Sequence, residues 1–465
     1  MTVSLQSWAQ LEKAYFHERY PGYHLVAITR ESIKPDTRLC FHLEPDSAWC
    51  RCPKCGTCCA RFHDERVVFY MDWDIVEAAP ILLCLPSRRL RCRCGYRQTE
   101  DSPDWILSGH RITKRLAFFI QSLLSKRITI SDVSKITGVS WNLIKALDKE
   151  SLQQQFGGAV DFSCVKRIAL DEISIHKGHK YATVALDLQD KKVLAVLKGK
   201  RRRDIQPFFN EIKAAAAADQ IESASVDMNA VYPRLVQENL PNCKLAYDLF
   251  HVMQMFNKNV LKEAKKFTLA NVRAAVKELP KRSPEIKEAR AERDLQVKIL
   301  RHAEWLVVTK PEKLSPSRHE RLQELREHNA LFRDLFPLSA LLRSVWKAAN
   351  EDEAATRLQQ CIEVCQAVAE EHNFPAIRKF GNMLIRRSEG IITACVVRLG
   401  TNVLEGANNT AKVIKRLAYG FKDFSYFALK LKSAFPGKKF MANQRKASPA
   451  MLRWQGGVET LAFPL

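Results

Sequence analysis

Three carboxylates in this sequence stand where they could bind metal together. Asp171 and Asp227 each end a predicted β-strand, and Glu405 stands at the head of a predicted amphipathic helix within residues 399–421. At about 100° per residue, a helix gives Glu405 one face with polar and basic residues, namely Asn409, Lys412 and Arg416. The opposite face of that helix is apolar, with Val403, Ala407, Ile414 and Leu417. Taken alone, this pattern also fits a surface helix with one stray acid.

Converging carboxylates beside cationic side chains suit the cutting of phosphodiester bonds. Mg²⁺ prefers hard oxygen ligands and keeps several waters, so few carboxylates are needed. Two such ions about 3.5–4 Å apart can activate the attacking oxygen and stabilise the leaving one. We expect Asp171 to bridge both Mg²⁺ ions, Asp227 to bind one and Glu405 the other, with Mn²⁺ as a substitute. Residues of the same helix and just beyond it are expected to contact DNA: Asn409, Lys412, Lys415, Arg416 and Lys422.

The order of the predicted elements explains how two of these acids meet. The sequence predicts β-β-β-α-β-α-β-α, with Asp171 ending the first strand, a hairpin turn at 189–192 and Asp227 ending the fourth strand. This is the order of a ribonuclease-H-like fold, in which the first and fourth strands are neighbours. Asp171 and Glu172 point to opposite faces of their strand, and Asp171 is the better candidate. The alternative is that both aspartates are ordinary strand-end acids.

Asp227 and Glu405 lie too far apart in sequence for the bare fold. The intervening chain is rich in Ala, Leu, Glu, Lys and Arg with apolar residues every three or four positions, which predicts an all-helical insertion. We expect its Trp305 and Trp346 to lie in the core, and a wedge near the cleaved DNA end is the alternative. His251 lies near the end of the fifth strand, just before a helix expected from about residue 252. We expect it either to assist the metal site or to be structural. Asp187, midway along the second strand, is expected to be structural.

Nine of the 14 cysteines lie between Cys40 and Cys94. Since no secretory signal precedes them, we expect bound metal rather than a disulfide framework. Two close pairs about 40 residues apart suit a tetrahedral structural Zn²⁺, as in a zinc ribbon. The expected ligands are Cys52, Cys55, Cys92 and Cys94. The rival ligands are Cys50, Cys58 and Cys59, and free buried cysteines are the alternative to a metal site.

Residues 127–156 read as helix, short glycine turn, helix. Ser131 is expected to cap a short helix carrying Val133 and Ile136, and Gly138 permits the turn. Ser140 should cap the second helix, which buries Leu143, Ile144 and Leu147. This arrangement is typical of a DNA-binding helix-turn-helix, and a plain helical hairpin is the alternative. The exposed face of the second helix would present Trp141, Asn142, Lys145 and Lys149.

Six stretches of the chain, in this order, resemble the transposases of the ISL-three family of bacterial insertion sequences. They are CPKCG at 52–56, LDEISIHKGHKYATVALDL at 170–188, VDMNAVY at 226–232, YDLFHV at 247–252, WLVVTKPEKLS at 305–315 and NVLEGANNTAKVIKRLAYGFKDF at 402–424. The resemblance implies a DDE transposase with Asp171, Asp227 and Glu405 as its triad. It also implies that the zinc ribbon and helix-turn-helix read the element's terminal inverted repeats. The shortened second cysteine pair, and Leu249 where an arginine is expected, depart from the pattern.

The composition points to a polyanionic partner. Lys and Arg outnumber Asp and Glu by 74 to 51, which gives a net charge of +23, and residues 411–446 carry ten Lys or Arg and one acid. Double-stranded DNA is the simplest partner, both as terminal repeats and as target. No apolar run of about 18 residues and no signal peptide are evident, so we expect no membrane partner and a cytoplasmic, nucleoid-associated protein. A homodimer or higher oligomer is expected on DNA.

We therefore expect a multidomain α/β protein. The predicted parts are an N-terminal segment with the zinc ribbon (1–104), the helix-turn-helix domain (105–160), the first part of the ribonuclease-H-like core (161–264), the helical insertion (265–395), the last part of the core with the Glu405 helix (396–440), and a C-terminal tail (441–465). Two other functions share some of these features. A catalytically inactive DNA-binding regulator would not need the three acids, and a structure-specific nuclease would not need the sequence-reading N-terminal half.

Overall fold

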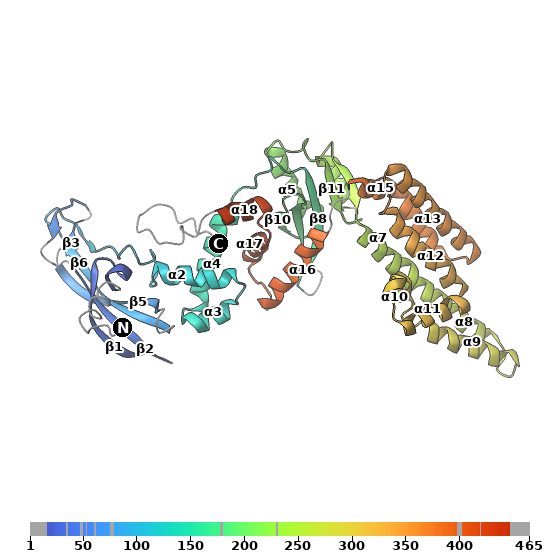
Figure 1. The fold of residues 1–465 in the computed structure, drawn as a ribbon, viewed down its shortest axis with the longest axis horizontal. Coiled ribbons are helices and arrows are strands. Elements are labelled where there is room, and N and C mark those ends of the chain that lie inside the picture. Colours follow the sequence, from blue (N-terminus) through green and yellow to red (C-terminus); the bar gives the residue numbers. More distant parts are fainter. Residues whose placement is uncertain are drawn as a thin grey trace, which may run out of the picture. The chain divides into compact units, whose positions relative to one another are not determined.

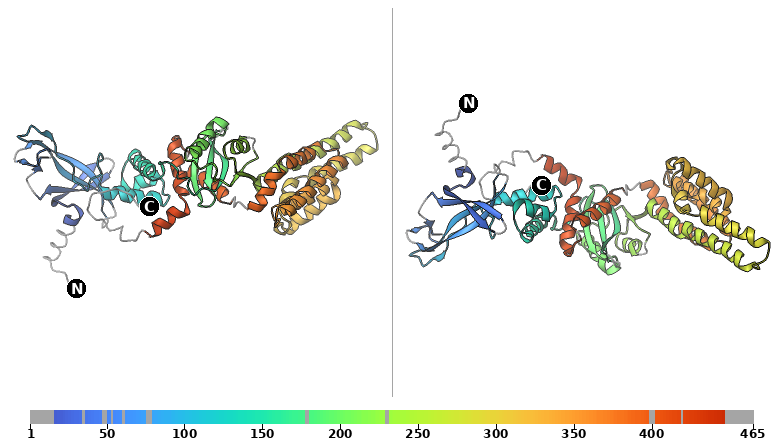
Figure 2. Two further views of the ribbon diagram at one scale, coloured as in Figure 1. Left: turned by 90° about the horizontal axis from the view of Figure 1, so that it is seen from above. Right: turned by 90° about the horizontal axis from the view of Figure 1, so that it is seen from below.

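The structure is a computed structural model that describes residues 16–33, 36–46, 50–52, 54–59, 62–74, 79–176, 180–228, 231–397, 402–418 and 420–446. The chain divides into two compact units, residues 1–158 with 447–465 and residues 159–446. Each unit is described by itself below (Figures 1 and 2). In the described ranges, no helix has the length and apolar character needed to cross a membrane.

The first unit begins with β-strands. In chain order these are β1 (Tyr23–Ile33), β2 (Asp36–Pro45), β3 (Cys50–Arg51), β4 (Cys58–Cys59), β5 (Phe62–Asp74), β6 (Ala79–Arg91) and β7 (Arg97–Thr99). One sheet has the order β1-β2-β6-β5, with β7 paired to β6, and the short β3 and β4 form a separate ladder. Leu43, Leu83 and Trp105 belong to the core of this sheet. The unit therefore has a hydrophobic core of its own beside the cysteine-rich ladder.

A disulfide joins Cys40 and Cys84, two of the clustered cysteines for which we expected bound metal rather than disulfides. The parallel pairing of β2 with β6 sets His42 opposite Cys84 and Cys40 opposite Leu82, so the two cysteines lie in adjacent strands. Both side chains are buried. Sequence spacing could not show this pair, because it depends on a parallel register between strands distant in sequence.

Three helices follow the sheet: α2 (Lys114–Ser125), α3 (Ile130–Thr137) and α4 (Trp141–Phe156). A buried acid joins α2 to the sheet, since Asp72 on β5 accepts hydrogen bonds from Thr113 (2.6 Å) and Tyr20 (2.9 Å) and pairs with Arg115. An unpaired buried carboxylate would be costly, and these partners satisfy it. This network fixes the start of α2 against β5.

The capping of α3 differs from the prediction, whereas that of α4 confirms it. Thr129, not Ser131, caps α3 by accepting from the backbone of Asp132, and Ser140 caps α4 by accepting from Leu143. Thr129 is the last extended residue before the helix, so its side chain rather than that of Ser131 reaches the free N–H groups. Gly138 between the helices has φ 67°, a left-handed conformation that favours glycine. The core of the three helices includes Val133, Ile144 and Leu147, Leu143 is half-buried, and Ile136 is exposed.

The second unit is built on a five-stranded sheet of order β10-β9-β8-β11-β12. Its elements before the insertion are β8 (Arg167–His176), β9 (Lys180–Asp187), β10 (Lys192–Lys198), α5 (Arg202–Ala214), β11 (Ser223–Val226), α6 (Val231–Asn239), β12 (Lys244–Tyr247) and α7 (Leu249–Phe256). β9 is antiparallel to its neighbours β8 and β10, whereas β11 is parallel to β8 and β12. The predicted element order and the pairing of the first strand with the fourth are confirmed.

Three local predictions are corrected. β8 continues through Asp171 to His176, because β9 keeps pairing with it beyond the end of β11. Asp187 ends β9 instead of lying midway, and it accepts from the backbone of Gln189 (2.8 Å) in the turn. α7 begins at Leu249, earlier than expected, because Asp248 caps it by accepting from the Phe250 backbone.

The chain between the core segments is helical, as predicted. After the π-helical turn η1 (Asn257–Leu261), its helices are α8 (Lys262–Glu278), α9 (Glu285–Ile299), α10 (Ala303–Val308), the 3₁₀ turn η2 (Pro311–Lys313), α11 (Pro316–His328), α12 (Ala330–Val345), α13 (Glu351–Glu371), α14 (Pro375–Arg386) and α15 (Ser388–Val397). Trp346 packs against the core as expected. Trp305 is instead 41% exposed, with the Arg318 guanidinium over its ring.

The chain returns to the sheet through α16 (Asn402–Leu417), α17 (Phe424–Ala434) and α18 (Lys438–Lys446). Residues of α5 and α6, such as Phe208 and Leu235, share a hydrophobic core with Ile168 and Leu170 of β8. Alternate residues of β8 point to the other face, where α16 contacts the strand (Figure 1). By the alternation of side chains along β8, Asp171 points to this second face, the one that α16 contacts.

Candidate active site

Asp171 and Asp227 come from neighbouring parallel strands. Leu170 on β8 pairs with Val226 on β11, so the residue after each is one of the two aspartates. The Oδ1 atom of Asp227 lies 3.5 Å from Nδ1 of His251, on α7. The charges of His251 and Asp227 both act on Asp171. Two acids and one histidine, from β8, β11 and α7, therefore lie near the same end of the two neighbouring strands.

Burial controls the charge of Asp171. Its side chain is buried, and the loss of hydration raises the pKa of its carboxyl, with a further rise from the charge of Asp227. The charge of His251, the Glu172 N–H at 2.8 Å and the Asn408 amide at 2.5 Å oppose this rise. Glu172 points elsewhere, to Lys200 at 3.0 Å, as the alternation along the strand predicts. A cation beside Asp171 would offset its unfavourable burial.

Helix α16 is held along β8 by two hydrogen bonds. Asn408 donates to Asp171, and the Lys415 ammonium donates to the Ser174 carbonyl at 2.7 Å. Seven helical residues rise about 10.5 Å and three strand residues about 10 Å, so the two elements keep the same register along this length. Glu405 lies one turn before Asn408, where Cβ atoms are about 5–6 Å apart.

Glu405 itself is exposed, and no hydrogen bond or ion pair joins it to another described residue. Among the described side chains that converge within 4.8 Å as possible metal ligands, the three acids do not occur as one group. The structure thus brings Asp171 and Asp227 together and sets Glu405 on the helix that contacts Asp171. Full convergence of the three carboxylates would require Glu405 to turn toward the strand edge.

The faces of α16 differ from the prediction. Its buried residues are Leu404, Ala407 and Ala411, whereas Leu417 is 41% exposed. Ala407 is common to the predicted and the observed apolar face, whereas Leu404 and Ala411 take the place of Ile414 and Leu417 in the buried stripe. Lys415 is also not free for DNA, since it is bonded to Ser174. The exposed polar residues of this region are Asn409, Lys412, Arg416 and Lys422.

The four predicted zinc ligands do come together in the first unit. The sulfurs of Cys52, Cys55, Cys92 and Cys94 all lie within 4.8 Å of one another. Cys52 and Cys94 are 3.7 Å apart, and Cys55 and Cys92 are 3.5 Å apart. A tetrahedral Zn²⁺ with Zn–S bonds of about 2.3 Å separates its sulfurs by about 3.8 Å. The spacing therefore fits this metal.

Glycine turns allow both cysteine pairs to fold back. Gly56 (φ 70°) donates to the Cys52 carbonyl, and Gly95 (φ 88°) donates to the Cys92 carbonyl. The second turn compensates for the shortened spacing of its pair. The hydrogen bond with Thr57 contributes most to lowering the pKa of the Cys55 thiol to about 6, which favours the thiolate that a metal needs. Of the rival ligands, Cys50, Cys58 and Cys59 are described only as backbone of β3 and β4.

The predicted reading face of α4 is only partly exposed. Trp141 and Asn142 are exposed, whereas Lys145 and Lys149 are half-buried. The Lys145 ammonium lies 5.8 Å from the centre of the Trp141 ring.

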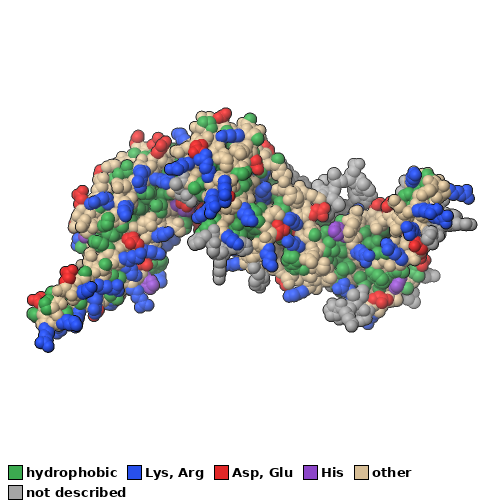
Figure 3. Space-filling model, turned by 180° about the vertical axis from the view of Figure 1, so that it is seen from behind, with side chains coloured by type: hydrophobic (Ala, Val, Ile, Leu, Met, Phe, Trp, Pro, Cys, Tyr) green, Lys and Arg blue, Asp and Glu red, His purple; other side chains and the backbone are tan. Residues whose placement is uncertain are grey.

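Figure 3 shows that blue basic side chains outnumber red acidic ones on the face drawn. A phosphate backbone would be attracted to such a surface.

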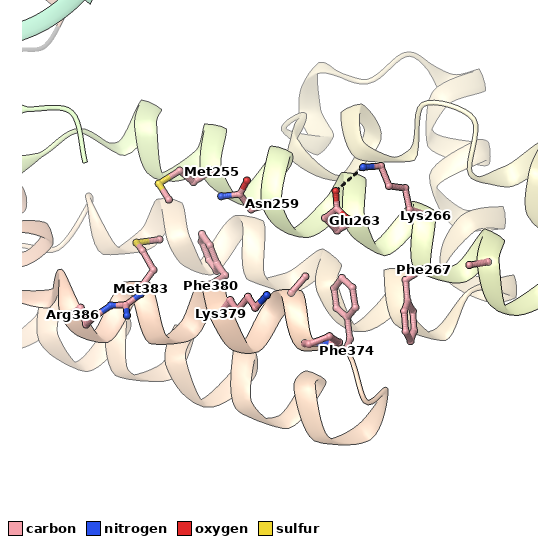
Figure 4. Close-up of a pocket in the computed structure, with 13 residues that line it drawn as sticks. Met255, Asn259, Glu263, Lys266, Phe267, Phe374, Lys379, Phe380, Met383 and Arg386 are labelled. Atoms are coloured by element: carbon pink, nitrogen blue, oxygen red, sulfur yellow. Dashed lines mark hydrogen bonds and ion pairs between the residues drawn. The ribbon is translucent and has the colours of Figure 1, made fainter. Parts of the chain in front are cut away.

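A groove of about 760 Å³ lies in the second unit, between α8 and α14 (Figure 4). Phe267, Phe374 and Phe380 line it together with Lys379 and Arg386. Glu263 and Lys266 at its edge pair with each other at 2.8 Å. None of the candidate metal ligands lines this groove.

Comparison with known proteins identifies the family. A family model of DDE transposases of the ISL3 type, described as "Transposase", matches residues 168–431. The transposase for insertion sequence element IS1001 of Bordetella parapertussis is 30% identical over 87% of this chain and 93% of its own. The transposase for IS1557 of Mycobacterium tuberculosis is 23% identical over 83% of this chain and 86% of its own. The chain therefore belongs to the ISL-three family of DDE transposases.

Proposed function

We propose that this transposase cuts and joins DNA at a ribonuclease-H-like site formed by Asp171, Asp227 and Glu405. The sheet order and the parallel pairing of β8 with β11 support the fold, because they juxtapose the first two acids. The observation that carries the proposal is the docking of α16 on Asp171 through Asn408, one turn from Glu405. The arrangement of strands alone would leave the third acid unplaced.

The residues present fit a divalent metal. Asp171 is a buried carboxylate whose charge is only partly compensated, and the Asn408 amide oxygen beside it is buried without a hydrogen-bond partner in the described residues. Hard oxygen donors of this kind suit Mg²⁺ or Mn²⁺. When bound, two such ions would activate the attacking oxygen and stabilise the leaving one. Asp171, Asp227 and Glu405 would together hold these ions.

We further propose that the first unit binds the terminal inverted repeats. The four-cysteine cluster would hold a structural Zn²⁺, and α3 with α4 would act as a helix-turn-helix. Trp141, Asn142, Lys145 and Lys149 would face DNA from α4. In the second unit the exposed residues next to the site would contact phosphates: Asn409, Lys412, Arg416 and Lys422. Two copies of the chain, or more, would act on paired ends in the nucleoid.

The proposal is tested with the full-length, zinc-loaded chain and a labelled duplex of the element's end. Mg²⁺-dependent cleavage should be lost in Asp171→Asn, Asp227→Asn and Glu405→Gln, and double variants should be little worse than single ones. Binding of the duplex should persist in all of them and should weaken steeply with salt. Cleavage by Asp227→Asn at the wild-type rate would refute the assignment.

A further inference from the structure

Asn408 is the polar residue of the site to which the sequence pattern gave no role. It lies on α16, and its Nδ2 donates to Oδ2 of Asp171 at 2.5 Å. The backbone N–H of Glu172 donates to the other carboxylate oxygen, Oδ1, at 2.8 Å. Both oxygens of Asp171 are therefore held, one by its own strand and one by the helix that carries Glu405.

The orientation of the Asn408 amide follows from chemistry. An ionised carboxylate only accepts hydrogen bonds, so the NH₂ group of the amide must face Asp171. The amide oxygen Oδ1 is then buried and has no hydrogen-bond partner in the described part of the chain. Buried polar atoms are nearly always paired in folded proteins, and an unpaired one in a candidate site calls for an explanation. A donor brought by a bound cation would supply the missing partner.

We propose that Asn408 is a positioning residue of the metal site, which fixes Asp171 through its NH₂ group and accepts a hydrogen bond at Oδ1 from the water shell of the bound cation. The inference rests on the proposed role of Asp171 in metal binding. Mg²⁺ and Mn²⁺ keep several waters when few carboxylates bind them, so such a donor is available. A neutral amide suits this position, because a carboxylate there, in addition to the three proposed acids, would add repulsion to Asp171 and Asp227.

The same amide also couples the two halves of the site. Asp171 and Glu405 come from segments separated by the whole helical insertion, and Asn408 provides the hydrogen bond that joins α16 to Asp171. Outer partners of metal ligands typically contribute 10–100-fold to metal affinity, because they fix the ligand's orientation. Loss of Asn408 should therefore weaken metal binding without removing any carboxylate.

The test is calorimetric titration of MnCl₂ into the full-length, zinc-loaded chain, with melting temperatures measured in parallel. Asn408→Ala should raise the Kd for Mn²⁺ by about 10–100-fold. Asn239→Ala is the matched control, because Asn239 is a buried asparagine of the same unit that bonds Gln206 (3.0 Å) and the Leu235 carbonyl (2.8 Å). The control should lower the melting temperature and leave the Kd for Mn²⁺ unchanged.

Asn408→Asp gives a second measurement that does not depend on the alanine variant folding. It keeps the shape of the side chain and turns a carboxylate toward Asp171, so the metal-free melting temperature should fall. Mn²⁺ should then raise the melting temperature more than it does in the wild type. An unchanged Kd in Asn408→Ala, or an unchanged metal-free melting temperature in Asn408→Asp, would overturn the inference. Asp171→Asn separates the two proposals, because undiminished Mn²⁺ binding in that variant defeats the proposed metal site itself.

Discussion

Glu405→Gln is the sharpest perturbation of the proposed triad. The change keeps the shape of the side chain and removes its charge. Glu405 is exposed and forms no hydrogen bond or ion pair with the described residues, so stability should change by no more than about 0.5 kcal/mol. Binding of the element's end should also stay close to wild type. Loss of stability therefore cannot account for a loss of cleavage.

The cleavage rate should nevertheless fall steeply. Removing one preorganised group that stabilises charge in the transition state typically costs about 3–4 kcal/mol, which corresponds to roughly 10²–10³-fold in rate. The assay is single-turnover, Mg²⁺-dependent cleavage of a labelled end duplex at saturating protein, beside a binding measurement.

Glu389→Gln provides the matched control for this experiment. Glu389 is an exposed acid on α15, upstream of α16, and would be the alternative third ligand if Glu405 were not one. The Glu389→Gln variant should cleave the duplex at the wild-type rate. The reasoning is refuted if Glu405→Gln keeps full activity, and activity lost only in Glu389→Gln would move the third ligand to α15.

Three further changes test other parts of the molecule. Cys92→Ser should release one Zn²⁺ per chain and lower the melting temperature, as measured by metal analysis and thermal unfolding, whereas Cys164→Ser at an exposed free cysteine should do neither. Burial raises the pKa of Asp171, so the free energy of unfolding of the metal-free wild type should increase as pH falls toward that raised pKa. Asp171→Asn should make the free energy of unfolding less dependent on pH. The same pH dependence in both proteins would contradict this prediction. Gly390→Ala should destabilise the chain by about 1–3 kcal/mol, because the new Cβ would lie 2.5 Å from the Tyr247 ring, and denaturant unfolding at wild-type stability would show that the contact is absent.

The topology of the second unit could be predicted from the sequence, because the sequence patterns that define its strands and helices are local. Apolar runs and turn residues define β8 to β12, and their order predicts that β8 and β11 are neighbours. The ends of the elements were less predictable. Asp171 lies within its strand because β9 continues to pair with it, which is a non-local interaction. The start of α7 was missed for a local reason, the capping side chain of Asp248.

The faces of α16 show where pattern analysis fails. A helical wheel predicted an apolar side that includes Ala407 and Leu417, but tertiary packing buries Leu404, Ala407 and Ala411 and leaves Leu417 exposed. Asn408 lay in the quoted motif, beside Glu405, yet its role depends on a partner far away in sequence. The four clustered cysteines were easier to predict than the faces of α16, because each close pair is folded by a local glycine turn. The disulfide between Cys40 and Cys84 could not be predicted, because it depends on the pairing of distant strands.

The insertion is physically tied to the site that it interrupts. Arg387, at the end of α14, donates to the Tyr247 hydroxyl at 2.6 Å and to the Met228 carbonyl at 2.7 Å. Met228 directly follows Asp227, and Tyr247 ends β12, so this guanidinium holds the strand ends that carry the second acid. The chain then continues through α15, which packs on β12, toward the helix that carries the third. The end of the all-helical segment is therefore fixed by hydrogen bonds to the same strand ends from which the insertion departs.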